Sequence, residues 1–309
     1  MNNRILITSI AGLAGLVVSK TLIKDYNLEL FGIDVVDYLI GVQEKIKYTI
    51  SPLTTSVEYY DFIKNFIHDY RIDIIIPVSS HDIDFFSINK DYFSQYCKLL
   101  ILDRELHNKM NNKPEAYKIL NEVGLLTPKI YTDNLTVEYP AILKPVRSSG
   151  SKDSFEILDE RDLTYYRGKF KNSFLSEYIL GDEYTCDCFF DKKGKCSGYV
   201  VRKREKVVSG AVVKSTNFEI DVSDTIHRLE KIKGLIGPIN FQFKIVNGQI
   251  IIFDLNDRMA SGGLALTIEL GLNIPKMIID ELEGRALNHK LSKRRLTMIR
   301  FYDEYFIEK

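Results

Sequence analysis

The 309-residue sequence lacks several features that mark large classes of protein. Its four cysteines, at positions 97, 186, 188 and 196, are too few and too scattered for the disulfide framework of a secreted protein. Lysine plus arginine and aspartate plus glutamate each number 42, so the chain has no basic excess of the kind that nucleic-acid-binding and membrane-binding proteins usually carry. These deficits fit a reducing, cytoplasmic setting and favour neither nucleic acid nor membrane as a partner, so binding would depend on locally placed charges.

Long apolar segments are missing as well. No run reaches the roughly 18 to 20 residues of a transmembrane helix. The apolar stretch from Ile5 to Val18 is similar to a short signal peptide, but no small-residue cleavage site follows it. Gly12 and Gly15 within it stand where a strand-to-helix turn needs glycine, which favours a strand followed by a helix. Cys186 and Cys188 have no second Cys or His pair nearby, so we expect buried thiols of a strand rather than metal ligands.

Nucleophilic catalysis has no convincing signature either. The five histidines, at positions 68, 81, 107, 227 and 289, lie far in sequence from any motif of a nucleophilic serine or cysteine. His81 and Asp82 follow a predicted strand, and we interpret them as a surface pair of a loop, with contact to substrate as the alternative.

Strands and helices alternate in the first third of the chain. Apolar runs predict strands at 4–9, 28–34, 72–78 and 97–102, and residues 59–70 have apolar side chains at the spacing of one helix face. This alternation is typical of an α/β fold with a doubly wound parallel sheet, which we assign to residues 1–104.

The pattern changes after residue 104. A helix is predicted at 113–123, and short strands follow on both sides of a polar loop at 147–152. Beyond residue 183 the pattern is antiparallel, and Asn247-Gly248 between two apolar runs is a strong signal for a tight hairpin. The sequence therefore changes to an α+β pattern after residue 104.

Hard oxygen ligands gather on this predicted hairpin. Asp254 and Asn256 lie two residues apart on one strand and share a face, and Gln242 falls near Asp254 across the pair. Such a set suits Mg²⁺, and Arg258 follows closely enough to hold a phosphate. A polar, solvent-facing hairpin edge is the alternative.

Two lysines are further candidates for phosphate binding. Lys144 ends an apolar strand beside the Ser/Gly-containing loop, whose backbone N–H groups favour anions, and Lys113 begins the predicted helix. A solvated surface lysine is the alternative at each position.

Taken in order, these residues resemble the motifs of the ATP-grasp superfamily, and most closely those of its carbamoyl-phosphate-synthase-like ligases. The likeness extends from Ile5 to about Pro275. It rests on an ordered series of short motifs: Lys113, Lys144-Pro145 with its loop, Glu177-Tyr178-Ile179-x-Gly181-x-Glu183, Gln242 and Asp254-x-Asn256-x-Arg258.

The resemblance implies a role for each of these residues. The nucleotide-binding residues would be Lys113, Lys144, the loop residues Ser148, Ser149, Gly150 and Ser151, the adenine-reading linker Glu177, Tyr178 and Ile179, and the ribose-binding Glu183. Gln242, Asp254 and Asn256 would bind Mg²⁺, with Mn²⁺ as an alternative ion. Arg258, Arg204 and Arg202 would stabilise the transferring phosphoryl group.

The same resemblance implies an α+β fold of two subdomains, residues 105–178 and residues 179–309, with ATP between them. It also implies an ATP-dependent ligase of small-molecule substrates. It would activate a carboxylate as an acyl-phosphate, join it to an amine or ammonia, and release ADP and phosphate, in a protein that is commonly a homodimer. The chain departs from the usual motif at three points: Asp254 replaces a glutamate, Asp257 replaces a proline, and the loop at 147–152 has a single glycine.

Two other functions remain as alternatives. One is a regulatory protein that binds a nucleotide without catalysis. The other is an NAD(P)-dependent oxidoreductase, because Gly12, Gly15 and Asp34 match part of a dinucleotide-binding motif. Ile10 stands where the first glycine of that motif belongs.

Overall fold

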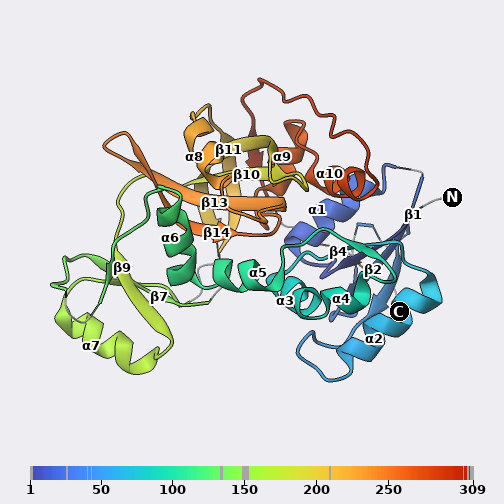
Figure 1. Cartoon of the computed structure of the whole chain (residues 1–309), viewed down its shortest axis with the longest axis horizontal. Helices are drawn as coiled ribbons and strands as arrows, with labels where there is room; N and C mark the ends of the chain where they lie inside the picture. The colour runs from blue at the N-terminus through green and yellow to red at the C-terminus, as the bar shows by residue number, and fades with distance from the viewer. Residues whose placement is uncertain are drawn as a thin grey trace.

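The computed structural model describes residues 3–25, 27–39, 41–42, 44–132, 135–147, 153–208, 210–301, 303–304 and 306. Ser148, Ser149, Gly150 and Ser151 of the predicted phosphate loop lie outside the described residues. Three sheets organise the described part of the chain, one parallel and two antiparallel (Figure 1).

The first sheet is parallel, with the strand order β3-β2-β1-β4-β5. Its strands are β1 (Asn3–Thr8), β2 (Leu28–Asp34), β3 (Lys47–Ile50), β4 (Ile74–Ile76) and β5 (Lys98–Leu99). The helices of this region are α1 (Leu13–Leu22), α2 (Tyr59–Tyr70), α3 (Ser80–Ile88) and α4 (Lys90–Phe93). The predicted doubly wound sheet is thus confirmed, and its strand order reverses between β1 and β4, where such sheets bind ligands at the carboxyl ends of the strands.

Helices cover both faces of this sheet, which explains its continuous apolar strands. Ile5 and Ile7 of β1 pack into one cluster with α1 and with α10 (Ile274–Leu282), and Leu6 between them packs into another with α2 and α3. The turn after β1 is held closely against α1, because a Cβ atom at Gly15 would lie 2.4 Å from the carbonyl oxygen of Ser9.

The second sheet is small and antiparallel, with the order β6-β9-β7-β8. Its elements are β6 (Ile130–Tyr131), β7 (Ala141–Pro145), β8 (Phe155–Ile157), α7 (Glu160–Lys169) and β9 (Ser173–Glu177). Figure 1 shows it with α7 as a lobe at the opposite end of the molecule from the parallel sheet.

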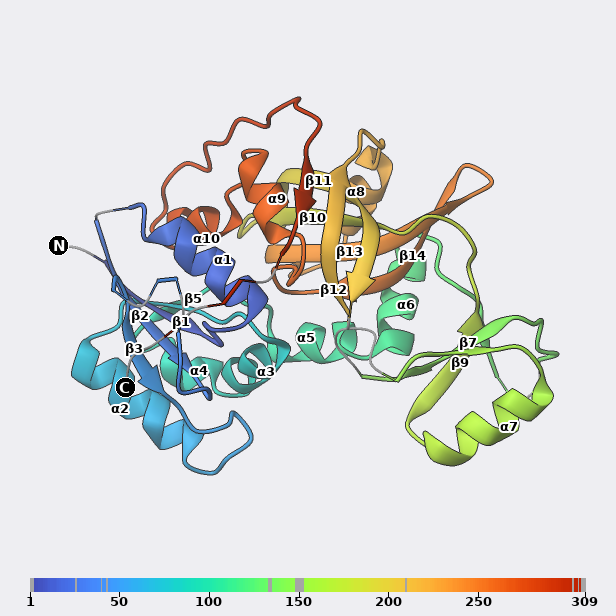
Figure 2. The ribbon, with the colours of Figure 1, turned by 180° about the vertical axis from the view of Figure 1, so that it is seen from behind.

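The third sheet is antiparallel, with the order β14-β13-β10-β11-β12-β15. Its strands are β10 (Tyr184–Phe190), β11 (Cys196–Val208), β12 (Ala211–Asn217), β13 (Gly237–Val246), β14 (Gln249–Asn256) and β15 (Thr297–Ile299). The remaining helices are α5 (Arg104–Met110), α6 (Lys113–Glu122), α8 (Ser223–Leu229), α9 (Leu264–Glu269) and α10 (Ile274–Leu282). Figure 2 shows this sheet from behind, between the other two.

Two expectations from composition can be checked directly. Cys186 and Cys188 are fully buried thiols of β10, as predicted, and all four cysteines are free. None of the helices among the described residues is long and apolar enough to cross a membrane.

Candidate functional site

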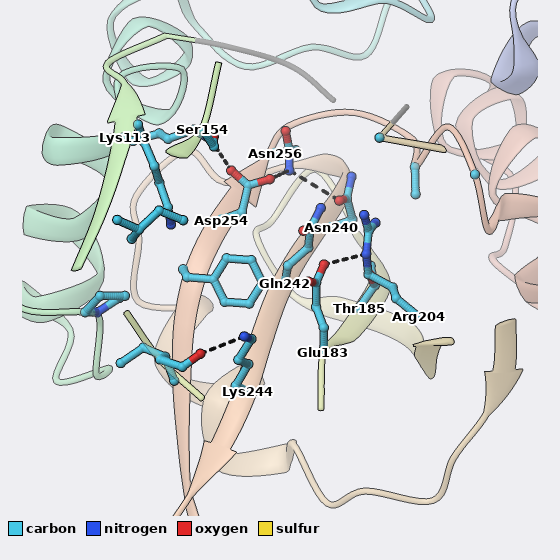
Figure 3. Close-up of a pocket in the computed structure, with 18 of the residues that line it drawn as sticks. Lys113, Ser154, Glu183, Thr185, Arg204, Asn240, Gln242, Lys244, Asp254 and Asn256 are labelled. Atoms are coloured by element: carbon cyan, nitrogen blue, oxygen red, sulfur yellow. Dashed lines mark hydrogen bonds and ion pairs between the residues drawn. The ribbon is translucent and has the colours of Figure 1, made fainter. Parts of the chain in front are cut away.

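One pocket collects the predicted site residues. It lies between the small sheet and the third sheet and is lined from both. The predicted residues that line it are Lys113, Lys144, Glu177, Tyr178, Ile179, Glu183, Arg202, Arg204, Gln242, Asp254, Asn256 and Arg258. Every predicted site residue that the structure describes is therefore in a single cavity (Figure 3).

The third sheet sets the spacing of these side chains. Across four neighbouring strands, Arg202 pairs with Thr185, Thr185 with Gln242, and Gln242 with Asp254. Directly opposed residues of antiparallel strands point to the same face, so this row projects a cation, a hydroxyl, an amide and a carboxylate into the pocket side by side. A second row joins Asn240 of β13 to Asn256 of β14.

A β-bulge at Phe253 brings Asp254 opposite Gln242. The Asn247-Gly248 turn pairs Val246 with Gln249, and this regular register would place Gln242 opposite Phe253. The register shifts between Gln242 and Phe243, so Phe253 is the additional residue. Both Phe253 and Asp254 consequently line the pocket.

The Asp254 carboxylate is kept ionised by its neighbours. Burial raises its pKa, but the ion pair with the Lys113 ammonium group and the hydrogen bond from Asn256 Nδ2, 2.8 Å long, lower it by more. The net effect is a pKa below the ordinary value of aspartate. Asp254, which already pairs with a cation, lies in the pocket beside the amides of Gln242 and Asn256. Carboxylate and amide oxygens are ligands that Mg²⁺ prefers.

Arg258 is held beside the candidate Mg²⁺ ligands by hydrogen bonds. Its Nη2 donates to Asn256 Oδ1 over 3.3 Å, and its Nε donates to Ser80 Oγ over 3.0 Å. Its carbonyl oxygen accepts a 2.7 Å hydrogen bond from Asn240 Nδ2. The guanidinium thus bridges the third sheet and the start of α3.

Lys144 is a buried lysine, with 9% of its surface exposed. Burial and the nearby charge of Lys113 lower its pKa to about 8. Its ammonium group lies over the ring of Phe253, 5.3 Å from the centroid. A buried cation of this kind is stabilised by an anionic ligand such as a phosphate.

Arg202 is held so that one part of its guanidinium lacks a protein partner. Its Nε and Nη2 bond to Asp187 at 2.8 and 3.4 Å, and Asp187 also accepts from Thr267 Oγ1 at 2.5 Å. Nη1 is buried and has no hydrogen-bond partner among the described residues, and the same is true of Thr185 Oγ1. Buried polar atoms of this kind are costly without a partner, which points to a ligand in the pocket.

The predicted nucleotide linker follows β9. The carbonyl of Ile179 accepts a 2.6 Å hydrogen bond from Lys244 Nζ, which also lies 5.5 Å from the centre of the Tyr178 ring. Glu183 forms a 2.5 Å ion pair with Arg204, and one Glu177 oxygen accepts from the backbone N–H of Lys129 at 3.2 Å. Glu183 and Arg204 therefore neutralise each other at this side of the pocket.

The sequence analysis missed several residues of the pocket. Asn240 and Lys244 lie two residues before and after Gln242 on β13, so strand alternation alone could have indicated both. The position of Thr185 in the pocket depends on the pairing of strands that are distant in sequence, and no local signal identifies this residue. The other lining residues not predicted as site residues are Pro128, Ile142, Ser154, Gly210, Phe253 and Ala260. Ser261 and Gly262 also line the pocket, and the resemblance to the ATP-grasp superfamily implies that the stretch Ser261-Gly262-Gly263 helps to shape the acceptor site.

The charges in the pocket define its chemistry. Lysine and arginine side chains outnumber carboxylates along its wall, which favours a polyanionic ligand. Among the described residues there is no cluster of three or more His, Cys, Asp or Glu that could hold a metal ion. A metal bound at Asp254 would therefore share its coordination with oxygens of the ligand, as Mg²⁺ commonly does with phosphates.

Comparison with known proteins identifies this architecture. Residues 169–301 match a family model described as "ATP-grasp in the biosynthetic pathway with Ter operon". No curated protein matches the sequence.

Solved structures match over almost the whole chain. N5-carboxyaminoimidazole synthetase from Staphylococcus aureus, in complex with ADP, is 14% identical with a TM-score of 0.75, and the match covers 97% of this chain and 83% of that one. L-amino acid ligase from Bacillus licheniformis is 14% identical with a TM-score of 0.71, over 91% of this chain and 74% of the other. Biotin carboxylase from Campylobacter jejuni is 18% identical with a TM-score of 0.71, over 94% and 73%.

Proposed function

We propose that this chain, which has the ATP-grasp fold and resembles that superfamily in its sequence motifs, is an ATP-dependent ligase that joins a carboxylate to an amine or ammonia. The observation that carries the proposal is the row Arg202, Thr185, Gln242 and Asp254 on one sheet face, opposite Lys144 and Lys113. It combines a carboxylate of the kind that binds Mg²⁺, cations of the kind that bind phosphates, and a buried arginine nitrogen without a protein partner among the described residues.

The nucleotide half of the site would hold ATP at the linker. The backbone around Tyr178 and Ile179 would read the adenine edge, and Glu183 would bind the ribose hydroxyls. Lys144 and Lys113 would neutralise the phosphates, and Asp254 with Asn256 and Gln242 would hold Mg²⁺. Bound Mg²⁺ would neutralise charge on the phosphate oxygens during transfer.

The reaction would have two steps. An oxygen of the acid attacks the γ-phosphorus, and the bond to the β-phosphate oxygen breaks, giving an acyl-phosphate and ADP. The amine nitrogen then attacks the acyl carbon, phosphate leaves with one oxygen of the acid, and the nitrogen loses a proton. The protein would contribute mainly position and charge stabilisation, since the pocket has no nucleophile paired with a base among its described residues.

Arg202 would stabilise the acyl-phosphate. Asp187 binds its Nε and Nη2 and is itself held by the hydroxyl of Thr267, which leaves Nη1 as the donor that still needs an acceptor. Gly263 packs against the same guanidinium, because a Cβ at this position would lie 2.0 Å from Arg202 Cζ. The arginine is thus prepared for an anion before any ligand binds.

A test needs both substrates and a control for folding. We expect Mg²⁺- and ATP-dependent release of phosphate that rises only when an acid and an amine are both present, with amino acids as the first pool because one similar structure is an L-amino acid ligase. Asp254→Asn should abolish the release. The matched control is Asp280→Asn, which removes a buried, ion-paired carboxylate of α10 and should keep full activity.

The outcomes separate the proposal from its alternatives. If ATP binds but no pool of acids and amines causes phosphate release, the result would support a regulatory nucleotide-binding protein instead. Failure to bind ATP would contradict the proposal altogether. A homodimer, and Mn²⁺ in place of Mg²⁺, remain predictions of the resemblance.

A further inference from the structure

Asp257 has no role in the function proposed above, although it stands between Asn256 and Arg258. It is not among the described residues that line the pocket. Its side chain is 3% exposed, and its Oδ2 lies 2.6 Å from Nδ1 of His107. A buried carboxylate needs such a partner, since an unpaired charge in the interior is strongly destabilising.

His107 has a second carboxylate on its other ring nitrogen. Its Nε2 lies 2.8 Å from Asp84 Oδ1 on α3, and its own side chain, on α5, is completely buried. Burial lowers the pKa of His107, but the hydrogen bonds and charges of Asp257 and Asp84 raise it to about 9. The imidazole can therefore carry two protons and donate to both carboxylates at once.

Helix α3 reaches the same segment by a second contact. Ser80, in its first turn, accepts the 3.0 Å hydrogen bond from Arg258 Nε. Helix α3 follows β4 of the parallel sheet and lies beside α5 in both Figure 1 and Figure 2. The chain around Asp257 is thus attached to α3 at two points, through Ser80 directly and through His107 and Asp84.

We infer that the Asp84–His107–Asp257 bridge is a positioning device, which orients Asn256 and Arg258 toward the metal and the phosphates. Asp257 is one peptide bond from each of them, so a bridge that fixes the Asp257 side chain limits the movement of both neighbours. Residues that hold metal ligands from behind commonly change metal affinity by about 10- to 100-fold when they are replaced. The inference rests on the proposed function, because it assumes that the pocket binds Mg²⁺ with a nucleotide.

The test measures how much Mg²⁺ strengthens nucleotide binding. ADP is titrated calorimetrically into the full chain with Mg²⁺ and then with EDTA, and the ratio of the two dissociation constants is the gain from Mg²⁺. His107→Gln should change the metal-free Kd by less than about twofold and reduce the gain by about 10-fold or more. A general loss of packing would weaken both titrations alike.

Four further variants make the result specific. Asp84→Asn, at a side chain that is 39% exposed, should reduce the gain in the same direction and decides the question if His107→Gln does not fold. Asp257→Asn alone should also reduce the gain, and the double variant with His107→Gln should lose no more than the larger of the two single losses, because both changes break one bridge. Asp280→Asn, the buried carboxylate of α10, should leave the gain unchanged.

The possible failures are distinguishable. An unchanged gain in a folded His107→Gln or Asp84→Asn variant, or fully additive losses in the double variant, would overturn the positioning role while leaving the proposed function intact. If Mg²⁺ gives no gain in the wild-type chain, the proposed function fails and the inference fails with it.

Discussion

Lys144 illustrates at the scale of one residue how burial can make nucleotide binding depend on pH. With a pKa of about 8, this lysine loses its charge as the pH rises through a range where a surface lysine stays protonated. If only the protonated form binds the phosphates, the Kd for ATP should rise about fivefold between pH 8 and pH 9. Lys144→Arg keeps its charge and should give a flat profile, whereas an equally steep profile in this variant would refute the explanation.

Gly263 is a residue whose importance lies in the side chain it lacks. Gly263→Ala would place a methyl group on the Arg202 guanidinium and push Nη1 out of position. We expect ligase turnover to fall by about 100-fold, as for the loss of one preorganised donor, with the Kd for ATP nearly unchanged. Gly168→Ala is the control, because a Cβ there meets nothing within 4 Å. Normal turnover in Gly263→Ala would remove Arg202 from the mechanism.

How far single residues could be predicted depended on how local the signal was. Asp254 and Asn256 share a face because they are two apart in a strand, and the sequence reveals this directly. The bond of Arg202 to Asp187 follows from the pairing of β10 with β11, and the sequence analysis could not anticipate it. The Asp257–His107 contact joins residues 150 positions apart, so no spacing rule could have indicated it.

At the scale of elements, the β13–β14 hairpin combines a predictable turn with an unpredictable bulge. Asn247 and Gly248 both have positive φ, 50° and 78°, as their sequence predicted for a tight hairpin turn. The bulge at Phe253 has no comparable signature, yet it decides which residue opposes Gln242. Turn type follows from two residues, whereas a bulge follows from the packing of the whole strand.

Helix α3 is an element that the sequence analysis missed, and His81 and Asp82 were wrongly interpreted as a surface loop pair. Asp82 is buried and completes a capping box with Ser79 at the start of the helix. A serine followed three residues later by an acid is a recognised start signal, so the helix was predictable. The run at 97–102 forms a strand only at Lys98–Leu99.

The Asn247-Gly248 turn of the β13–β14 hairpin allows a test of stability that changes no residue of the pocket. A Cβ at Gly248 meets no atom within 4 Å, so Gly248→Ala adds only the cost of a positive φ in a residue other than glycine. The free energy of unfolding, measured with urea, should fall by about 1 kcal/mol, and the Kd for Mg²⁺-ADP should not change. A weakened nucleotide affinity would mean that the turn and the bulge are coupled.

At the scale of the whole molecule, zero net charge conceals a strongly cationic pocket. The 42 basic and 42 acidic residues balance over the chain, but the pocket gathers Lys113, Lys144, Lys244 and three arginines against few carboxylates. The order of motifs along the sequence was sufficient to predict the fold, and the predicted site residues that the structure describes line one pocket. The contacts that α3 and α5 make with the segment after β14 could be seen only in three dimensions.

The most direct test of the proposed chemistry follows the oxygen atoms of the acid. ATP, Mg²⁺ and an amine are incubated with the enzyme and with acids whose carboxylate oxygens are ¹⁸O, and the released phosphate is analysed by mass spectrometry. Activation as an acyl-phosphate predicts that each released phosphate carries one ¹⁸O and that the nucleotide product is ADP. Unlabelled phosphate, or AMP with pyrophosphate, would contradict the account.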